Sequence, residues 1–155
     1  MSLRLDPGFD EVLTVTDYYD GPRQGIANLG GHPHFYDRIF DEARQDYSHL
    51  YRLTPVPPEL LALALEDWAI WERWEKAFHV GRATTESHPA LPQDRDRHLE
   101  IKFTLDAELK TDVNNSVIRA GSFAIIDIEK RAEAGRDLRV KWLDEETKTD
   151  SIWTR

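Results

Sequence analysis

Residues 17–25, with the sequence DYYDGPRQG, form the densest group of side chains in the chain that could do chemistry. Two carboxylates, two phenols and one guanidinium surround a turn that Asp-Gly and Pro favour. In one interpretation, the guanidinium holds a carboxylate or phosphate through paired hydrogen bonds and the phenols line the pocket. In the other, Arg23 pairs with Asp17 or Asp20 and the tyrosines pack on neighbouring side chains. The candidate ligand-binding residues of this segment are Asp17, Tyr18, Tyr19, Asp20 and Arg23.

The six histidines raise the question of a metal site. His32 and His34 are two residues apart in a predicted strand, so both imidazoles would lie on one face and join the candidate ligand site. The pairs Glu75/His79 and Asp94/His98 have the spacing of neighbours on a helix, and are equally well explained as helix-surface pairs. No spacing matches a known metal motif, so we expect neither a metal nor another cofactor. The weak candidate metal ligands are His32, His34, Glu75, His79 and His98.

Residues 65–75 (LEDWAIWERWE) contain three tryptophans and four acidic residues. Trp68, Trp71 and Trp74 recur every three residues, which predicts a core stripe of a helix packed against the sheet. Alternatively, Trp68 lines a groove with Glu66 or Asp67 at its rim. Contact with an indole face would then raise the pKa of the carboxyl group and suit it to general acid catalysis.

Composition excludes several classes of function. The chain has 155 residues, no cysteine and a formal net charge of −9. A thiol nucleophile or a cysteine zinc site is therefore impossible, and the negative charge argues against binding to nucleic acid or anionic membranes. Phosphate-loop, dinucleotide and nucleophile-elbow motifs are absent from the sequence. The N-terminus lacks an apolar signal region, and no apolar run has the length of a membrane span, so we expect a soluble cytoplasmic protein.

The elements that must position these residues begin with strands. Alternating β-branched and aromatic residues, separated by Asp20-Gly21 and Gly30-Gly31, predict an antiparallel meander. The predicted strands are residues 11–19, 25–29, 32–40 and 49–53, followed near the C-terminus by a hairpin of residues 117–128 and 138–143, with a possible bulge at Gly121.

Two helices are predicted between these groups of strands. A proline-rich stretch precedes residues 58–80, where apolar residues recur at helical spacing up to Gly81. Residues 93–113 are ambiguous, because their apolar residues alternate as in a strand while their composition favours a helix. We interpret them as a helix.

This order of elements predicts an α+β fold. The simplest arrangement is an antiparallel sheet of about five or six strands, with a two-helix unit inserted between them. A bent or barrel-like sheet is the alternative, because the first strands are short and interrupted by glycine. We expect one domain over residues 1–155, with flexible ends at about 1–9 and 144–155.

Four motifs carry a resemblance to a family. They are DYYDGPR-x-G (residues 17–25), GHPHF (31–35), Y-x-LTP (51–55) and ALEDW (64–68). In these motifs the chain resembles a family of small soluble bacterial proteins with no assigned function. The resemblance implies a cytoplasmic bacterial domain whose second helix follows residues 88–92, and it implies no activity.

The sequence favours a non-enzymatic binding or interaction module that recognises a protein or a small molecule. Its site would include the turn at residues 18–23 and the strand of His32 and His34. One alternative is a small metal- or carboxylate-dependent hydrolase that uses the histidines and acidic residues above. The other is a homo-oligomeric structural protein with Trp142 and Trp153 at its interface.

Overall fold

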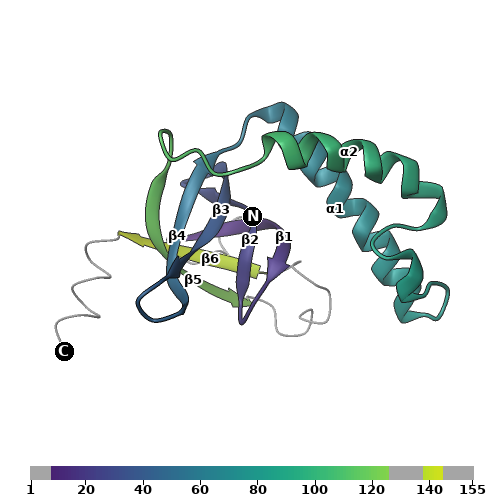
Figure 1. Ribbon diagram of the computed structural model, residues 1–155, viewed down its shortest axis with the longest axis horizontal. Coiled ribbons are helices and arrows are strands. Elements are labelled where there is room, and N and C mark those ends of the chain that lie inside the picture. Colours follow the sequence, from purple (N-terminus) through teal and green to yellow (C-terminus); the bar gives the residue numbers. More distant parts are fainter. Residues whose placement is uncertain (1–7, 126–137, 145–155) are drawn as a thin grey trace. The chain divides into compact units, whose positions relative to one another are not determined.

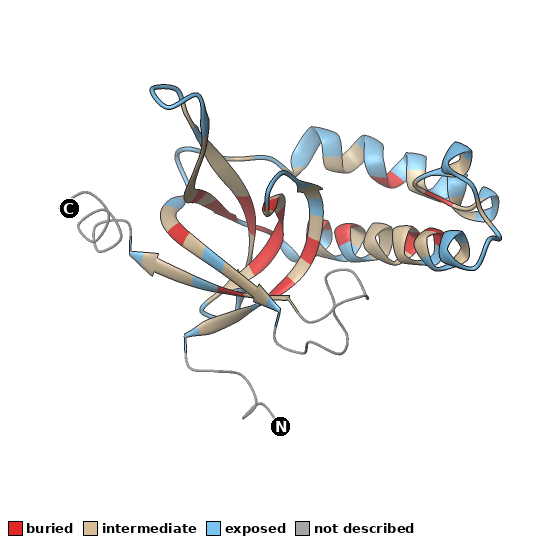
Figure 2. Ribbon diagram, turned by 90° about the horizontal axis from the view of Figure 1, so that it is seen from below, coloured by how far each residue is buried: buried red, intermediate tan, exposed pale blue. Residues whose placement is uncertain are grey.

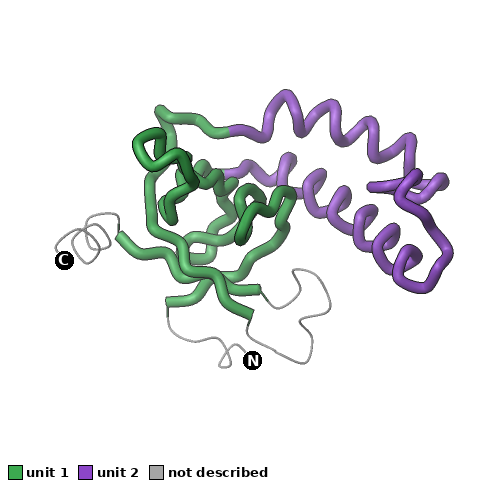
Figure 3. The backbone as a smooth tube through the Cα atoms, turned by 60° about the horizontal axis from the view of Figure 1, so that its bottom comes forward, with its two compact units in different colours: residues 1–55, 111–155 green, residues 56–110 purple. Residues whose placement is uncertain are grey.

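The computed structural model of the chain describes residues 8–125 and 138–144 (Figure 1). The chain divides into two compact units, residues 1–55 with 111–155 and residues 56–110 (Figure 3). The single domain expected over residues 1–155 stays a prediction. The first unit contains β1 (Phe9–Tyr18), β2 (Pro22–Leu29), β3 (His32–Asp41), β4 (Asp46–Pro55), β5 (Val117–Ile125) and β6 (Leu138–Asp144). The second contains α1 (Pro58–His79), the short 3-10 helices η2 (Thr85–Ser87) and η3 (Pro92–Asp94), and α2 (Arg95–Glu108).

The six strands form a closed antiparallel barrel, in which each strand pairs with the next in the chain and β1 pairs with β6. The predicted α+β class, the barrel-like alternative and the helical insertion between two strands are thereby confirmed. Three strands begin earlier than predicted, β1 at Phe9, β2 at Pro22 and β4 at Asp46. Residues 126–128 of a predicted strand, and nearly all of the expected flexible ends, lie outside the described residues.

Glycine permits the tight turn between β2 and β3. Gly30 and Gly31 have φ angles of 60° and 86°, which a two-residue hairpin requires and which glycine adopts without steric cost. The carboxylate of Asp10 on β1 accepts a hydrogen bond from each of these two backbone amides, both at 3.2 Å. The Gly-Gly dipeptide therefore forms the turn that the sequence predicts.

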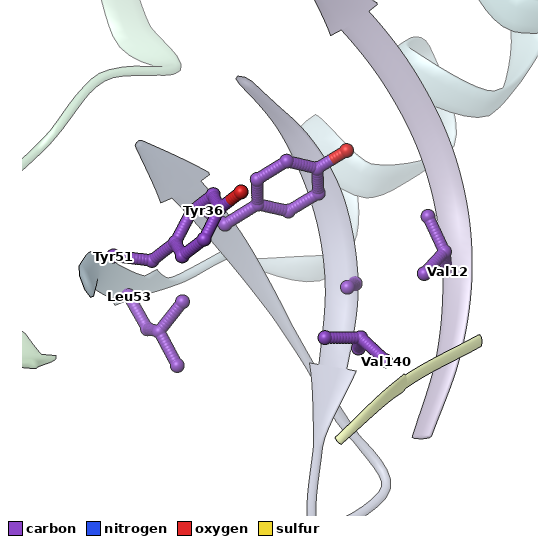
Figure 4. Close-up of a cluster of buried hydrophobic side chains, with 6 residues drawn as sticks. Val12, Tyr36, Tyr51, Leu53 and Val140 are labelled. Atoms are coloured by element: carbon purple, nitrogen blue, oxygen red, sulfur yellow. The ribbon is translucent and has the colours of Figure 1, made fainter. Parts of the chain in front are cut away.

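Aromatic side chains fill much of the barrel interior. Tyr36 and Tyr51 lie with their ring centroids 5.8 Å apart, and Figure 4 shows them beside Val12, Leu53 and Val140. The ring of Phe123 is 5.5 Å from each of the two tyrosine rings. In Figure 2 the buried residues of this unit are concentrated along the barrel strands, so the barrel has a packed core.

The two buried tyrosines both have hydrogen-bond partners. The hydroxyl of Tyr36 donates to the carbonyl oxygen of Thr14 at 3.0 Å, and that of Tyr51 to the carbonyl oxygen of Pro22 at 2.6 Å. Burial raises the pKa of Tyr51 to about 12 and raises the pKa of Tyr36 well above its ordinary value. At Gly25, a Cβ atom would lie 2.5 Å from the Tyr36 hydroxyl oxygen, so glycine makes room for this ring.

Two expectations about β5 and β6 are wrong. No bulge occurs at Gly121, since the pairing of β5 with β6 runs in regular register from Arg119 to Ile125. Glycine is needed there because a Cβ atom would lie 2.6 Å from the Trp142 ring and 3.0 Å from the Tyr51 ring. Trp142 is not exposed as expected, because it packs against the core and its Nε1 donates to the carbonyl oxygen of Asn28 at 2.9 Å; its part in an interface stays a prediction. Trp153 lies outside the described residues.

The second unit is built from α1 and α2, and α2 confirms the helix for Arg95–Glu108 of the ambiguous segment 93–113, whereas residues 109–113 are not helical. Ile70, Ala90 and Ile101 form its buried cluster, with Leu63 and Leu105 packed against them. Leu99 and Phe103 point away from this cluster and are 54% and 81% exposed. The alternation of apolar residues thus reflects two opposite faces of a helix. Among the described residues, no helix is long and apolar enough to cross a membrane.

The tryptophans of α1 do not form one uniformly buried stripe. Trp74 is buried and has partners within its own unit, whereas the predicted packing of the stripe against the sheet stays a prediction. Its Nε1 atom donates to Ser87 Oγ at 3.0 Å, and its ring stacks on Phe78 at 5.0 Å between centroids. Trp68 and Trp71 are partly exposed, with ring centroids 4.8 Å apart. The helix rotates by about 300° over three residues, so the three indoles spread around its axis.

Candidate functional site

The β1–β2 turn, residues 19–21, and the β3–β4 loop, residues 42–45, lie at the same end of the barrel (Figure 1). This follows from the antiparallel order, because alternate connections of a meander return to the same end. Side-chain contacts join the two connections. The rings of Tyr19 and Tyr47 lie 5.5 Å apart, and Nη1 of Arg38 donates to the carbonyl oxygens of Tyr19 and Asp20 at 2.9 and 3.2 Å.

Four aromatic side chains gather at this end, and we call them the tyrosine rim. Tyr18 is 69% exposed, Tyr19 57% and Phe40 40%, while Tyr47 is partly buried and contacts Tyr19 and Phe40. Large apolar side chains grouped in this way on a protein surface are a feature of interaction sites. The rim residues are Tyr18, Tyr19, Phe40 and Tyr47.

Tyr47 is the centre of the rim. Its ring meets Phe40 edge-on at 5.1 Å and Tyr19 at a tilt, so three of the four rings are in contact. Two guanidinium groups also face this ring, those of Arg23 at 5.7 Å and Arg38 at 5.9 Å. Each such cation–π contact contributes roughly 0.5–1 kcal/mol at an exposed site. The rings of Tyr19 and Phe40 are thus held against Tyr47 before any partner arrives.

Arg23 does not offer a free guanidinium. Its Nε donates to Asp17 Oδ2, and its Nη1 lies 3.9 Å from Asp37 Oδ1. Burial by itself lowers the pKa of Arg23, but the hydrogen bond with Asp17 and the nearby carboxylates raise it above its ordinary value. The geometry therefore matches the pairing alternative with Asp17. A role for Arg23 as an anion clamp stays a prediction, and this arrangement does not favour it.

Arg38 fastens the rim to the barrel. Besides its two bonds to the β1–β2 turn, its Nε donates to the carbonyl oxygen of Ser48 on β4 at 2.7 Å. One side chain thus connects β3 to β4 and to the β1–β2 turn. The sequence offers no sign of this role, because Arg38 is a single basic residue within a strand. Tyr47 is not among the predicted site residues, because it lies outside the predicted fourth strand, which begins at residue 49.

Acidic residues occupy the same connections and strand ends as the aromatic residues of the rim. Asp20, Glu42 and Asp46 are exposed and Asp41 is partly exposed, whereas Arg44 is the one basic residue of the loop 42–45. Asp41 and Asp46 are paired across the hairpin. Oδ1 of Asp41 accepts hydrogen bonds from the backbone amides of Ala43 and Arg44, at 3.0 and 3.3 Å. These two acidic residues therefore shape the loop and also add negative charge beside the rim.

His32 and His34 lie at the other end of the barrel, so the expected site that joined them to residues 18–23 does not form. β2 separates the two ends, and its eight residues span roughly 26 Å at ~3.3 Å per residue. Nδ1 of His34 lies 2.8 Å from the carbonyl oxygen of His32. Trp68, the remaining predicted ligand-binding residue, belongs to α1 in the second unit.

Of the two predicted helix-surface pairs, one is present and the other is not. Nε2 of His79 lies 3.6 Å from Glu75 Oε2, as the spacing suggested. Asp94 and His98 do not pair, because Asp94 precedes α2 and accepts two hydrogen bonds from Arg73, while His98 Nδ1 lies 2.7 Å from Asp67 Oδ1. In the described ranges, no three His, Asp or Glu side chains are grouped so that they could hold a metal ion.

Glu66 is not a raised-pKa acid. Arg97 donates to both of its carboxylate oxygens, at 2.7 Å each. This hydrogen bonding lowers the pKa of Glu66, the reverse of the effect expected from an indole face. Together with Arg73/Asp94 and His98/Asp67, the pair Arg97/Glu66 joins α1 to the segment that contains η3 and α2.

Comparison with known proteins identified no relationship: no family model matches the chain, and no curated protein or solved structure is significantly similar to it.

Proposed function

We propose that the protein is a non-enzymatic binding module that uses the tyrosine rim to hold a peptide segment of a protein partner. The observation that supports this most is the exposure of Tyr18, Tyr19 and Phe40 by 69%, 57% and 40% at one end of the barrel. Tyrosine is enriched at protein interfaces because its ring supplies large apolar area and its hydroxyl a hydrogen bond.

Contacts that fix the rim before a partner binds also favour binding. A side chain that is fixed before association loses less conformational entropy when the partner arrives. Tyr19 and Phe40 both contact Tyr47, and Arg38 fixes the turn that carries Tyr19. Rigid aromatic anchors on a firm scaffold are the pattern of effective binding surfaces.

Hydrolysis receives less support from the candidate residues. Glu66 is paired with Arg97, Asp94 with Arg73, and His98 with Asp67. These pairs hold the two helices together, which explains the presence of these residues without a catalytic role. The acidic sequence and the resemblance to small bacterial proteins support a soluble cytoplasmic module that binds neither nucleic acid nor membranes, and that needs no cofactor.

Selection of peptides from a random phage-displayed library tests this function. The full chain is the bait, and recovered peptides are measured against a Tyr18→Ser/Tyr19→Ser variant. Loss of two interface tyrosines should weaken binding by at least about tenfold, equivalent to about 1.4 kcal/mol. Phe103→Ser is the matched control, because Phe103 is 81% exposed on α2, outside the rim. Recovery of no peptide, or equal binding to both variants, would contradict the proposal.

A further inference from the structure

The chemistry around the tyrosine rim defines a class of partner. Four carboxylates, those of Asp20, Asp41, Glu42 and Asp46, lie on the two connections or at the adjoining strand ends, as the exposed rings do. Asp41 and Asp46 are directly paired in the hairpin, where like charges repel each other. A positively charged partner would relieve this repulsion, whereas a negatively charged partner would increase it.

Two basic residues near the rim have hydrogen-bond partners within the barrel end. Arg23 donates to Asp17, and Arg38 donates to the carbonyl oxygens of Tyr19, Asp20 and Ser48. Their charges are therefore used to hold the barrel end together. The surface that remains for a partner consists of aromatic faces and carboxylates, with Arg44 as the basic residue of the loop.

We infer that the tyrosine rim binds a cationic peptide segment, with arginine or lysine side chains on the faces of Tyr18 and Tyr19 and against the carboxylates of the β3–β4 loop. This inference rests on the proposed function and adds the chemical class of the partner. Guanidinium and ammonium groups are attracted both by aromatic faces and by carboxylates. Cation–π contacts of this kind occur within the barrel itself, since Arg23 and Arg38 face the ring of Tyr47 at 5.7 and 5.9 Å.

The charge of the whole chain supports the same partner. A formal net charge of −9 attracts a cationic segment over a distance and raises its rate of association. A second copy of the chain is a poorer occupant, because two identical rims would bring their carboxylates together. Charge complementarity therefore favours a basic peptide over self-association.

Three measurements on the recovered peptides test the inference. Arginine and lysine should be enriched relative to the starting library. Replacement of the peptide's arginines by citrulline, which is neutral and of similar shape, should weaken binding by about tenfold or more. An increase in sodium chloride from 50 to 500 mM should weaken binding by about fivefold or more, because salt screens surface charges.

A charge-neutralising variant tests the protein side. Asp41→Asn/Asp46→Asn removes two negative charges but keeps the side-chain oxygens that accept backbone hydrogen bonds, so the loop can retain its conformation. Binding should weaken by about fivefold or more. Asp96→Asn/Glu108→Gln is the matched control, with the same change of net charge at exposed positions of α2, and should bind as the unaltered chain does.

The outcomes separate this inference from the proposed function. Peptides that depend on Tyr18 and Tyr19 but are neutral or acidic, or that bind independently of salt, would overturn the cationic partner and leave the binding module intact. A dimer in sedimentation that the Tyr18→Ser/Tyr19→Ser variant abolishes would assign the rim to a second copy and also overturn the inference. If no recovered peptide depends on the rim, both proposals fail.

Discussion

Arg38 shows how one side chain can organise a surface. Its guanidinium group donates to three backbone carbonyl oxygens, two in the β1–β2 turn and one on β4. It also faces the ring of Tyr47. A planar group with several fixed donors can make these contacts at once, whereas an ammonium group cannot reproduce the same fork.

We predict that Arg38→Lys lowers the free energy of unfolding by about 1–2 kcal/mol, because hydrogen bonds from the guanidinium are lost. Backbone amides of residues 19–21 should exchange with solvent faster in the variant, as measured by NMR. Arg44→Lys is the control, since Arg44 is exposed in the loop. Equal effects of the two substitutions would show that Arg38 does not hold the turn.

The buried phenol of Tyr51 gives a second prediction at this scale. Burial raises its pKa from 10.0 to about 12, an effect that Arg38 partly opposes. The folded state therefore keeps a proton that the unfolded state loses, and stability that is present below pH 10 decreases as the pH rises toward 12. The slope contributed by one such group is at most about 1.4 kcal/mol per pH unit.

Urea unfolding of the unaltered chain and of Tyr51→Phe, followed from pH 8 to pH 11.5, measures this effect. The variant should be less stable at pH 8 by about 1 kcal/mol, because the hydrogen bond to Pro22 is lost. The difference between the two proteins should diminish above pH 10. A constant difference across this range would mean that Tyr51 titrates alike in the folded and unfolded states.

At the scale of elements, α2 shows what the spacing of apolar residues can predict and what it cannot. The alternation of apolar residues in this segment is compatible with a strand, and only composition favours a helix. The structure resolves the ambiguity because Ile101 and Leu105, four residues apart, face the buried cluster. Leu99 and Phe103 have the same spacing but lie on the opposite face, 54% and 81% exposed.

Alanine substitutions on these two faces should therefore differ. We predict that Ile101→Ala costs about 2–4 kcal/mol of stability, because it leaves a cavity beside Ile70 and Ala90. Leu99→Ala should change stability by less than about 1 kcal/mol, since the side chain is more than half exposed. Thermal and urea unfolding measure both values. Similar costs at the two positions would contradict this orientation of α2.

The glycines show a second limit to what can be predicted from the sequence. Asp20-Gly21 and Gly30-Gly31 identify turns because their backbone requirement is local. Gly121 looks the same in the sequence but is required by Trp142 on the next strand and Tyr51 on β4. Its role depends on contacts between residues far apart in the chain, so a local pattern suggested a bulge where the strand is regular.

At the scale of the whole molecule, the order of strands and helices was predictable, whereas the barrel could be predicted only as an alternative to an open sheet. Strand periodicity and turn residues are local signals, whereas the pairing of β1 with β6 joins Phe9 to Lys141. The same limit applies to the tyrosine rim. Tyr18 and Tyr19 were identified in the sequence, but Phe40 and Tyr47 join them only because the meander returns β3 and β4 to the same end.

NMR mapping of a recovered peptide on the isotope-labelled full chain tests the tyrosine rim most directly. Titration of the peptide should shift the backbone amide signals of residues 18–21 and 38–47, with smaller changes elsewhere. The shifts should disappear at the same peptide concentration with the Tyr18→Ser/Tyr19→Ser variant. Shifts centred instead on His32 and His34, or on Leu99 and Phe103, would contradict the assignment of binding to the rim.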